Sequence, residues 1–303
     1  MSKDFLGIKD LDKNAIMTII ELAKQKKQEI FNNSFRKKIL KDKTLVTLFY
    51  ENSTRTKISF SVAGQYTGMN VSDLDVATSS VQKGESLIDT AVTLDQMGIN
   101  YIILRHQQTG APHLISKYVK ASVINAGDGS NEHPTQALLD FFTIYEKKSS
   151  FKGLNVTIIG DINNSRVARS NVIGLKKLGA NVTFSGPTTL LSKGMEVLGA
   201  KVSYDLKDAI RNADVIMGLR VQLERQSGMF PSLREYANIY GISSDLFTLA
   251  QKEAILMHPA PVNRGVELTS ELVDSSASVI NDQVTNGVAV RMAILELLQF
   301  GGF

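Results

Sequence analysis

The chain has 303 residues, of which 43% are hydrophobic and 21% charged, the composition of an ordinary soluble, folded protein. This length suits about two domains, each with its own core. The chain contains no cysteine, which excludes a disulfide framework, a thiol nucleophile and a thiolate metal site. Its four histidines leave no zinc cluster, so we expect neither a metal nor a cofactor.

The charge pattern bears on partners and location. Part of the net charge of +4 comes from lysine-rich runs at 24–27 and 36–43, which can mark a nucleic-acid surface. No aromatic stacking residues interleave with these runs, so solvated helix faces are the better interpretation and we expect no nucleic-acid partner. Residues 1–5 begin no apolar leader, and no stretch approaches the ~20 apolar residues that cross a bilayer. We therefore expect a cytoplasmic protein without a membrane partner.

The order of predicted elements indicates repeated βαβ units. After an opening helix with Ile16, Ile19, Ile20 and Ala23 on one face, short β-rich runs alternate with helical patterns. In the first half we expect strands at 44–50, 71–74, 101–104 and 122–125, and helices near 54–67, 86–97, 112–119 and 134–147. In the second half we expect strands at 155–160, 182–185, 201–204, 214–219 and 254–258, with helices between them.

These elements predict an α/β fold of two tandem, doubly wound parallel sheets. Nearly continuous apolar strands, such as 156–159, are typical of parallel sheets covered on both faces. Residues 149–153 form the natural hinge, which gives domains of 1–148 and 149–285. The strongly apolar helix at 288–299, within a final segment 286–303, is expected to pack back on the first domain.

The segment 49–60 has the layout of an anion-binding site. An apolar strand runs directly into Ser53-Thr54-Arg55-Thr56 and then into an amphipathic helix. The unpaired N–H groups of a first helical turn, three hydroxyls and one guanidinium can converge there on a small dianion. A serine or threonine before a helix is usually only a cap, but this density of donors exceeds what capping requires. The segment therefore predicts a phosphate site.

Other polar residues also follow predicted strands, where ligands of parallel α/β sheets bind. These segments are 53–56, 105–106, 127–136, 161–166, 220–222 and 258–264. Two familiar nucleotide motifs are missing. The segment 160–166 lacks the G-x-G-x-x-G spacing of a dinucleotide turn, and the sequence contains no G-x-x-x-x-G-K-[ST] loop.

Six motifs, in the same order, resemble the catalytic chains of the aspartate carbamoyltransferase family. They are Ser53-Thr54-Arg55-Thr56, the loop 79–85, Arg105-His106, the stretch 127–136, Arg220-Val221-Gln222 and His258-Pro259-Ala260-Pro261. The resemblance spans most of the chain. It implies transfer of a carbamoyl group from carbamoyl phosphate to L-aspartate, giving N-carbamoyl-L-aspartate and phosphate in pyrimidine synthesis.

The resemblance also implies a role for each matching residue in the carbamoyl-phosphate site. Ser53, Thr54, Arg55 and Thr56 form the phosphate cradle, and Arg105 bridges the phosphate and the carbonyl. His133 donates to the carbonyl oxygen and Gln136 holds the carbamoyl NH2, although a lone histidine before proline is often just a loop residue. Backbone carbonyls of Pro259, Ala260 and Pro261, in a turn that the prolines keep extended, accept from the carbamoyl NH2 and the attacking amine.

An aspartate acceptor has two carboxylates, and the guanidinium groups of arginines are suited to bind them. Arg166 and Arg220 follow strands of the second domain, and Gln222 adds an amide donor. Arginines at a surface are more often solvated or paired with acids, so neither is specific alone. By resemblance, Ser79 and the aspartate-binding Lys83 reach into the site of a neighbouring subunit, which implies a homotrimer with shared sites and possible regulatory chains. Residues 223–243 resemble a flexible loop that closes the site.

Two alternatives stay open. The first is an ornithine or other amino-acid carbamoyltransferase, although that enzyme typically carries a His-Cys-Leu-Pro segment and a Ser-Met-Gly loop that are missing here. Guanidinium groups would also repel a cationic acceptor. The second is a non-catalytic paralogue that acts as a scaffold, which the retention of the expected polar residues disfavours.

Overall fold

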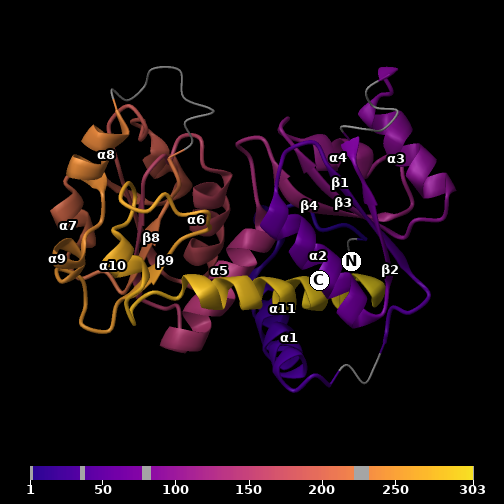
Figure 1. The fold of residues 1–303 in the computed structure, drawn as a ribbon, viewed down its shortest axis with the longest axis horizontal. Coiled ribbons are helices and arrows are strands. Elements are labelled where there is room, and N and C mark those ends of the chain that lie inside the picture. The colour runs from indigo at the N-terminus through magenta and orange to yellow at the C-terminus, as the bar shows by residue number, and fades with distance from the viewer. Residues whose placement is uncertain (1–2, 35–37, 77–82, 222–231, 303) are drawn as a thin grey trace. The chain divides into compact units, whose positions relative to one another are not determined.

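The computed structural model describes residues 3–34, 38–76, 83–221 and 232–302, which fold into two compact units (Figure 1). The first unit comprises Met1–Phe142 and Thr285–Phe303, and the second comprises Thr143–Val284. The sequence places the corresponding boundaries after 148 and 285. Two helices cross from one unit to the other along the chain, α5 (Pro134–Lys148) and α11 (Ile280–Gln299).

The first unit is built on a four-stranded parallel sheet in the order β2-β1-β3-β4. Its strands are Thr44–Phe49 (β1), Asn70–Leu74 (β2), Tyr101–His106 (β3) and Ser122–Asp128 (β4). Its other helices are Ile8–Asp10 (η1, a 3-10 helix), Lys13–Phe31 (α1), Thr54–Thr67 (α2), Leu87–Gln96 (α3) and Ala111–Ile115 (α4).

Both faces of this sheet are covered. Val46, Ile102 and Val123 stand in register across β1, β3 and β4 and share a core with α3 and α4. Their neighbours Leu45 and Ile124 point to the opposite face, because side chains alternate along a strand, and they are fully buried as well. Burial on both faces explains why these strands read as continuous apolar runs.

The end of α11 packs on the first unit, as the sequence predicts. Glu296 forms an ion pair of 2.7 Å with the buried Lys26 of α1. The hydroxyl of Tyr101, at the start of β3, donates to the carbonyl of Leu295 at 3.5 Å. The helix starts at Ile280, earlier than the expected 288. The apolar run in the sequence therefore marks only the later part of the helix, which is buried in this unit.

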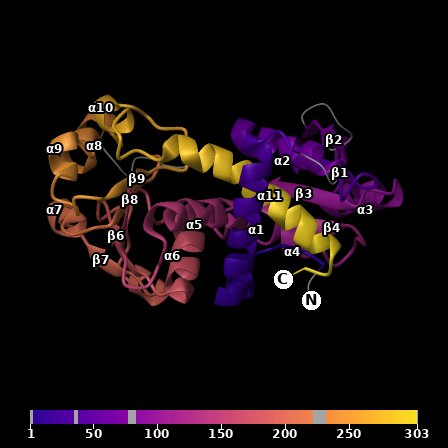
Figure 2. The same cartoon turned by 90° about the horizontal axis from the view of Figure 1, so that it is seen from below.

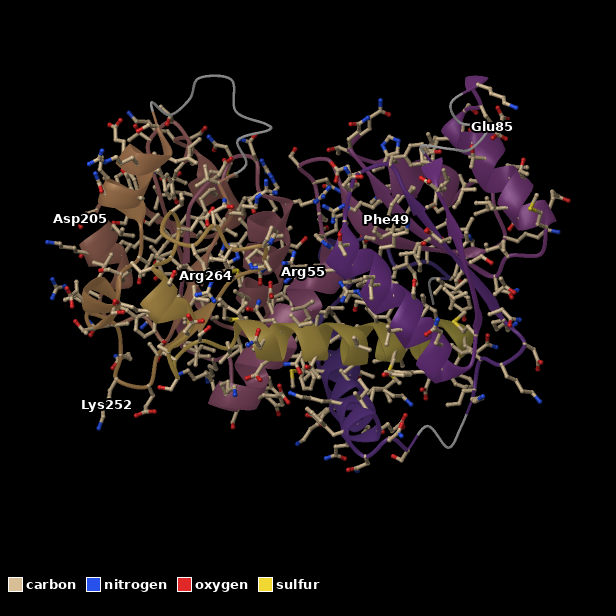
Figure 3. All side chains as sticks on the ribbon, in the orientation of Figure 1. Phe49, Arg55, Glu85, Asp205, Lys252 and Arg264 are labelled. Carbon is tan, nitrogen blue, oxygen red and sulfur yellow. The ribbon has the colours of Figure 1, made fainter. Side chains whose placement is uncertain are left out.

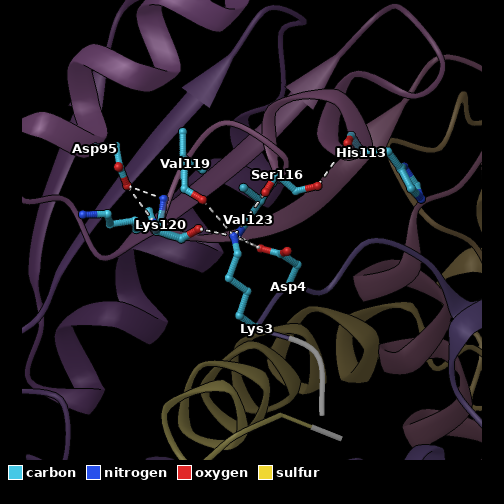
Figure 4. Close-up of polar contacts among 9 residues, drawn as sticks. Lys3, Asp4, Asp95, His113, Ser116, Val119, Lys120 and Val123 are labelled. Carbon is cyan, nitrogen blue, oxygen red and sulfur yellow. Dashed lines mark hydrogen bonds and ion pairs between the residues drawn. The ribbon is translucent and has the colours of Figure 1, made fainter.

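The N-terminal segment lies against β4, the edge strand of the sheet. The N–H of Phe5 donates to the carbonyl of Val123, and the carbonyl of Phe5 accepts from Asn125, each at 2.9 Å. Figure 4 shows how Lys3 fastens the segment: its ammonium donates to the Asp4 carboxylate and to three carbonyls, those of Ser116, Val119 and Ala121. The segment thereby covers an edge that would otherwise expose unpaired backbone groups.

The second unit is a five-stranded parallel sheet in the order β7-β6-β5-β8-β9. Figure 2 labels β6, β7, β8 and β9 of this sheet. Its strands are Asn155–Ile159 (β5), Asn181–Ser185 (β6), Lys201–Ser203 (β7), Val215–Gly218 (β8) and Ile255–Met257 (β9). Its helices are Arg166–Leu178 (α6), Met195–Leu198 (η4, a 3-10 helix), Leu206–Ile210 (α7), Leu233–Tyr240 (α8), Ser244–Phe247 (α9) and Ser270–Val273 (α10).

Every predicted strand is present, and the fold class is confirmed. The differences lie at element ends. The helix expected at 112–119 ends at Ile115, and the Asp95 carboxylate then accepts from the N–H groups of Lys120 and Ala121 at 2.9 and 2.7 Å, which turns the chain into β4 (Figure 4). Arg105 lies within β3, although the sequence analysis places it just beyond a strand.

Candidate active site

Strand order marks one special position in each sheet. In the first unit the chain moves from β1 outward to β2, then returns to β3 on the other side of β1. In the second unit the same reversal separates β5 from β8. Open α/β sheets bind ligands beyond the carboxyl ends of the strands at such a switch point. The candidate site residues can therefore be compared with two positions that topology alone defines.

The phosphate motif leaves β1 at the first switch point. Ser53 occupies the N-cap position of α2 with extended backbone, but its hydroxyl accepts no capping hydrogen bond. Thr56 is buried in the first turn, whereas Thr54 and Arg55 are exposed. Figure 3 shows Arg55 near the start of α2, shortly after Phe49 at the end of β1. The cap hydroxyl, the first-turn N–H groups and the guanidinium thus remain available to an anion.

Arg105 lies on the neighbouring strand of the same switch point. It stands opposite Phe49 in the pairing of β3 with β1, and its carbonyl accepts from the N–H of Tyr50 at 2.9 Å. Its Nε lies 3.2 Å from Oε2 of Glu51, and both side chains are largely buried. Glu51 is not among the residues predicted from the sequence, where it is a single acid between the strand and the hydroxyl motif. The carboxylate fixes the direction of the Arg105 guanidinium.

His106, the next residue of β3, has a structural environment. Its ring lies 4.7 Å from that of Tyr50, and its Nδ1 accepts from the N–H of Gln108 at 2.9 Å. Burial lowers the pKa of His106, so the imidazole is neutral near pH 7. The side chain therefore helps to hold the end of β3 and brings no additional positive charge to the switch point.

The loop before α5 presents His133. The histidine is 4% exposed, and its carbonyl accepts from the N–H groups of Gln136 and Ala137 at the start of the helix. Asp128, which is fully buried, organises the loop. Its carboxylate accepts from the N–H of Gly110 at 2.7 Å, from the Asn125 amide at 2.8 Å and from groups within the loop. Asp128 lies within the stretch 127–136, but its sequence position alone predicts no role for it.

Gln136 lies on the first turn of α5 and is 8% exposed. Its Nε2 donates to Oδ1 of Asp140, one helical turn later, at 3.0 Å. A carboxylate only accepts hydrogen bonds, so this contact fixes which end of the amide faces Asp140. The carbonyl oxygen of Gln136 is directed away from Asp140.

The loop residues expected from a neighbouring subunit are only partly described. Lys83 is exposed, in the segment before α3, whose N-cap Ser86 accepts from the N–H of Asp89. Ser79 lies outside the described residues. Of the loop 223–243, the part from 232 onward is described, and it contains the helix α8. The rest, like Gln222, lies outside the described residues.

Arg166 and Arg220 lie at the second switch point. Arg166 opens α6 and is 6% exposed, and the Ser165 hydroxyl before it caps the helix by accepting from Ala168. Arg220 follows β8 and is half-buried. The two parent strands are adjacent, since the N–H of Leu219 donates to the carbonyl of Ile159 at 2.8 Å. Both arginines therefore emerge at the carboxyl ends of neighbouring strands.

A buried carboxylate that sequence analysis missed supports this position. Glu267 accepts from the N–H of Val221 at 2.8 Å and from the N–H and side-chain amide of Asn263, each at 2.7 Å. Burial raises the pKa of Glu267, although the three hydrogen bonds oppose that shift. The carboxylate joins the segment that carries Arg220 to the loop that follows Pro261.

The Pro259-Ala260-Pro261 turn follows β9, the neighbour of β8. The N–H of His258 donates to Oε1 of Gln283 at 3.0 Å, and Nδ1 of His258 accepts from the N–H of Ala260 at 2.9 Å. Ala260 has a φ of +55°, in the left-handed region. The expectation of an extended turn is therefore wrong at Ala260, because the hydrogen bond back to His258 curls the chain.

Two cavities of the first unit lie elsewhere. One of about 770 Å³ is lined by the N-terminal segment, the start of α1, His113 and Leu297, and one of about 340 Å³ by the amino ends of β3 and β4. Of the predicted site residues that the structure describes, none lines either cavity. Among the described residues there is no group of three or more His, Cys, Asp or Glu placed to hold a metal. Within the same part of the chain, no helix combines the length and apolar character needed to cross a membrane.

The fold and the two switch points define a class: a two-unit α/β protein that presents cations and hydroxyls at the sites where such sheets bind ligands. Comparison with known families agrees with this class. The carbamoyl-P binding domain of aspartate/ornithine carbamoyltransferases matches residues 3–146, and the Asp/Orn binding domain matches residues 152–298. The chain belongs to the aspartate/ornithine carbamoyltransferase family.

Individual relatives cover nearly the whole chain. The aspartate carbamoyltransferase catalytic subunit of Acetivibrio thermocellus is 56% identical over 298 residues, 98% of this chain and 96% of that protein. The subunit of the same name from Caldanaerobacter subterraneus is 55% identical over 299 residues, 98% of each chain.

Solved structures of both branches of the family are similar to this fold. Ornithine carbamoyltransferase from Pyrococcus furiosus has a TM-score of 0.89 and 31% identity, covering 98% of this chain and 97% of that one. Aspartate transcarbamoylase from Trypanosoma cruzi, solved with carbamoyl aspartate and phosphate, has a TM-score of 0.87 and 28% identity, covering 96% and 94%. The fold does not separate the two acceptors.

Proposed function

We propose that this protein is an aspartate carbamoyltransferase, which transfers the carbamoyl group of carbamoyl phosphate to the amine of L-aspartate in pyrimidine synthesis. The observation that carries the proposal is the set of cationic and hydroxyl side chains at the two switch points. The first holds the hydroxyl and guanidinium motif beside Arg105, and the second holds Arg166 beside Arg220. The identity of 50–56% to several proteins named as aspartate carbamoyltransferase catalytic subunits favours aspartate over ornithine.

In the proposed site, the first unit binds carbamoyl phosphate. The hydroxyls of Ser53, Thr54 and Thr56, the first-turn N–H groups of α2 and Arg55 hold the phosphate. Arg105, directed by Glu51, bridges the phosphate and the carbonyl oxygen, toward which His133 also donates. The Gln136 carbonyl, directed away from Asp140, accepts from the carbamoyl NH2.

The second unit binds the acceptor. Arg166 and Arg220 each hold one carboxylate of aspartate, with Gln222 as a further donor. The neutral amine attacks the carbonyl carbon, a C–N bond forms, and the C–O bond to phosphate breaks. The departing phosphate takes the proton that the amine loses. Carbonyls of Pro259, Ala260 and Pro261 accept from the amine and the carbamoyl NH2 while this happens.

The assembly that we propose is a homotrimer in which Ser79 and Lys83 of one subunit complete the site of the next. Exposure of Lys83 is consistent with such a role. Regulatory chains remain compatible with this proposal, and two relatives are named as catalytic subunits. The cytoplasmic location stays a prediction, which fractionation of the host cell would check.

An acceptor assay tests the function directly. We expect the purified protein, supplied with carbamoyl phosphate, to release phosphate and form N-carbamoyl-L-aspartate with L-aspartate, and to do neither with L-ornithine. Guanidinium groups placed for two carboxylates repel the ornithine ammonium. Faster turnover with ornithine than with aspartate would show that the proposed acceptor is wrong. Silence with both acceptors, in protein that binds phosphate, would favour the non-catalytic scaffold.

A further inference from the structure

An arginine of α11 is buried in the first unit and is not among the residues assigned above. Arg291 is 3% exposed, and its Nη1 donates to Oγ of Ser59, on α2, at 2.9 Å. Its guanidinium carbon lies 4.9 Å from the centre of the Phe60 ring. Its Nη2 lies 3.4 Å from Oγ1 of Thr135, at the start of α5. One side chain therefore contacts the two helices whose first turns carry the carbamoyl-phosphate residues.

The charge of Arg291 is stabilised by a buried acid. Burial lowers the pKa of Arg291 to about 10, and attraction to the fully buried Asp140 opposes the shift. The guanidinium therefore stays charged near neutral pH. Arginine keeps its proton in such surroundings better than lysine does, and its planar fork can contact several partners at once.

Asp140 connects the charge of Arg291 to Gln136, a residue of the proposed site. The same carboxylate that attracts Arg291 accepts from Nε2 of Gln136 at 3.0 Å. As long as Asp140 is an anion, the Gln136 amide has one favourable orientation, because only its NH2 end can donate. A neutral residue at 140 would remove that preference.

We propose that Arg291 is a positioning residue for the carbamoyl-phosphate site. It fixes α2, and hence the phosphate cradle, through Ser59. Through Asp140 it sets the orientation in which the Gln136 amide meets the carbamoyl group. The inference rests on the proposed function for its second half only, since phosphate binding by α2 can be measured without any transfer reaction.

The packing around Arg291 is shaped for this side chain. A Cβ added at Gly287, one turn earlier on α11, would lie 2.6 Å from Nη1 of Arg291. A merely stabilising arginine is the competing explanation. Removing one partner of a buried ion pair leaves the other charge unpaired and lowers stability, so a lower Tm alone does not distinguish the two explanations and the ligand constants must do so.

The chain offers a matched control on α1, in a cation that pairs with α11. Lys26, also buried, pairs with Glu296 of α11 at 2.7 Å and with Glu29 of its own helix, α1. Arg291→Met and Lys26→Met each remove one buried cation that links α11 to a neighbouring helix. Only the first removes a contact to the helices of the site.

The experiment measures the KM for carbamoyl phosphate and for aspartate, the Kd for inorganic phosphate by calorimetry, and the Tm of each variant. For Arg291→Met we expect the KM for carbamoyl phosphate and the Kd for phosphate to rise about tenfold or more, with the KM for aspartate within about twofold. For Asp140→Asn we expect the KM for carbamoyl phosphate to rise and the Kd for phosphate to stay unchanged, because the contact between Arg291 and Ser59 remains. Lys26→Met should lower the Tm and leave all three constants unchanged.

Three results would overturn the inference. One is an unchanged Kd and KM in Arg291→Met, and another is an equal change in Lys26→Met. The third, which also decides the case if Arg291→Met does not fold, is unaltered carbamoyl-phosphate affinity in both Asp140→Asn and Arg291→Lys. Wild-type protein that binds phosphate but transfers nothing would instead contradict the proposed function, and the phosphate Kd of the variants would still test the role of Arg291.

Discussion

The two guanidinium groups at the first switch point are held in different ways. Arg105 lies on a strand beside the carboxylate of Glu51, largely buried, so its direction is fixed before any ligand arrives. Arg55 is exposed on the first turn of α2, where a side chain contributes little to the fold. A variant at Arg55 therefore separates ligand binding from stability more cleanly than a variant at Arg105.

Arg55→Ala should abolish most turnover and leave the fold intact. Losing one donor to the charged phosphate and its developing charge costs about 100-fold to 1,000-fold in rate. We expect the Tm to stay within about 1 °C of wild type, because an exposed side chain is removed. Steady-state assays and thermal denaturation give both quantities.

Lys57→Ala is the control for Arg55→Ala. Lys57 is a cation of the same helix that is already paired with Asp73 at 2.5 Å. Its removal should change the rate far less than the loss of Arg55. A rate near wild type in Arg55→Ala, or equal losses in the two variants, would contradict the proposed cradle.

At the scale of elements, the N-terminal segment reaches the loop that carries His133. Glu132, which is 2% exposed, accepts from the N–H groups of Ile8 and Lys9 at 2.8 and 3.4 Å. Gly7 approaches the same carboxylate so closely that an added Cβ would lie 2.5 Å from Oε1 of Glu132. With a φ of −162°, Gly7 is extended, so only contact and not backbone conformation requires glycine there.

Gly7→Ala should consequently loosen the segment and the loop together. We expect a destabilisation of about 1–3 kcal/mol, typical of an overpacked buried site, and a higher KM for carbamoyl phosphate. Denaturant unfolding and steady-state assays measure these effects. Lys9→Ala keeps the backbone N–H that Glu132 accepts from and alters only an exposed side chain, so it should behave as wild type. Equal behaviour of the two variants would show that the contact does not matter.

The sequence predicts these elements well because their cause is local. Apolar strand runs such as 156–159 report burial on both faces, and the hydroxyl motif after β1 reports a helix start beside a ligand. Long-range partners are not predictable in this way. Glu51 acts on Arg105 only because Phe49 and Arg105 stand in register. Likewise, the sequence Pro-Ala-Pro does not predict that Ala260 adopts a left-handed conformation.

Across the whole molecule, both switch points follow one construction. Cations proposed for the substrates stand at the carboxyl ends of adjacent strands, and buried carboxylates behind them hold the loops. Asp128 serves the first unit in this way and Glu267 the second. A carboxylate that accepts several backbone N–H groups orders a loop without adding a positive charge. The cations are predictable from the sequence and the carboxylates are not, because the partners of the carboxylates are distant in the chain.

The proposed sharing of sites between subunits predicts complementation. A chain with Lys83→Ala keeps its own cradle but cannot complete its neighbour's site, and a chain with Arg55→Ala has the opposite defect. After joint dissociation and reassembly, about a quarter of the sites in a random mixture should pair an intact cradle with an intact Lys83. We therefore expect the mixture to regain about that fraction of wild-type activity, although each variant alone is nearly inactive.

A second mixture provides the control for this complementation. Arg55→Ala and His133→Ala both damage residues of the first unit of one chain, so no combination of these subunits yields an intact site. That mixture should stay inactive while light scattering shows the same assembly. If the Lys83→Ala and Arg55→Ala mixture also stays inactive in assembled particles, Lys83 serves its own chain and the shared site is refuted.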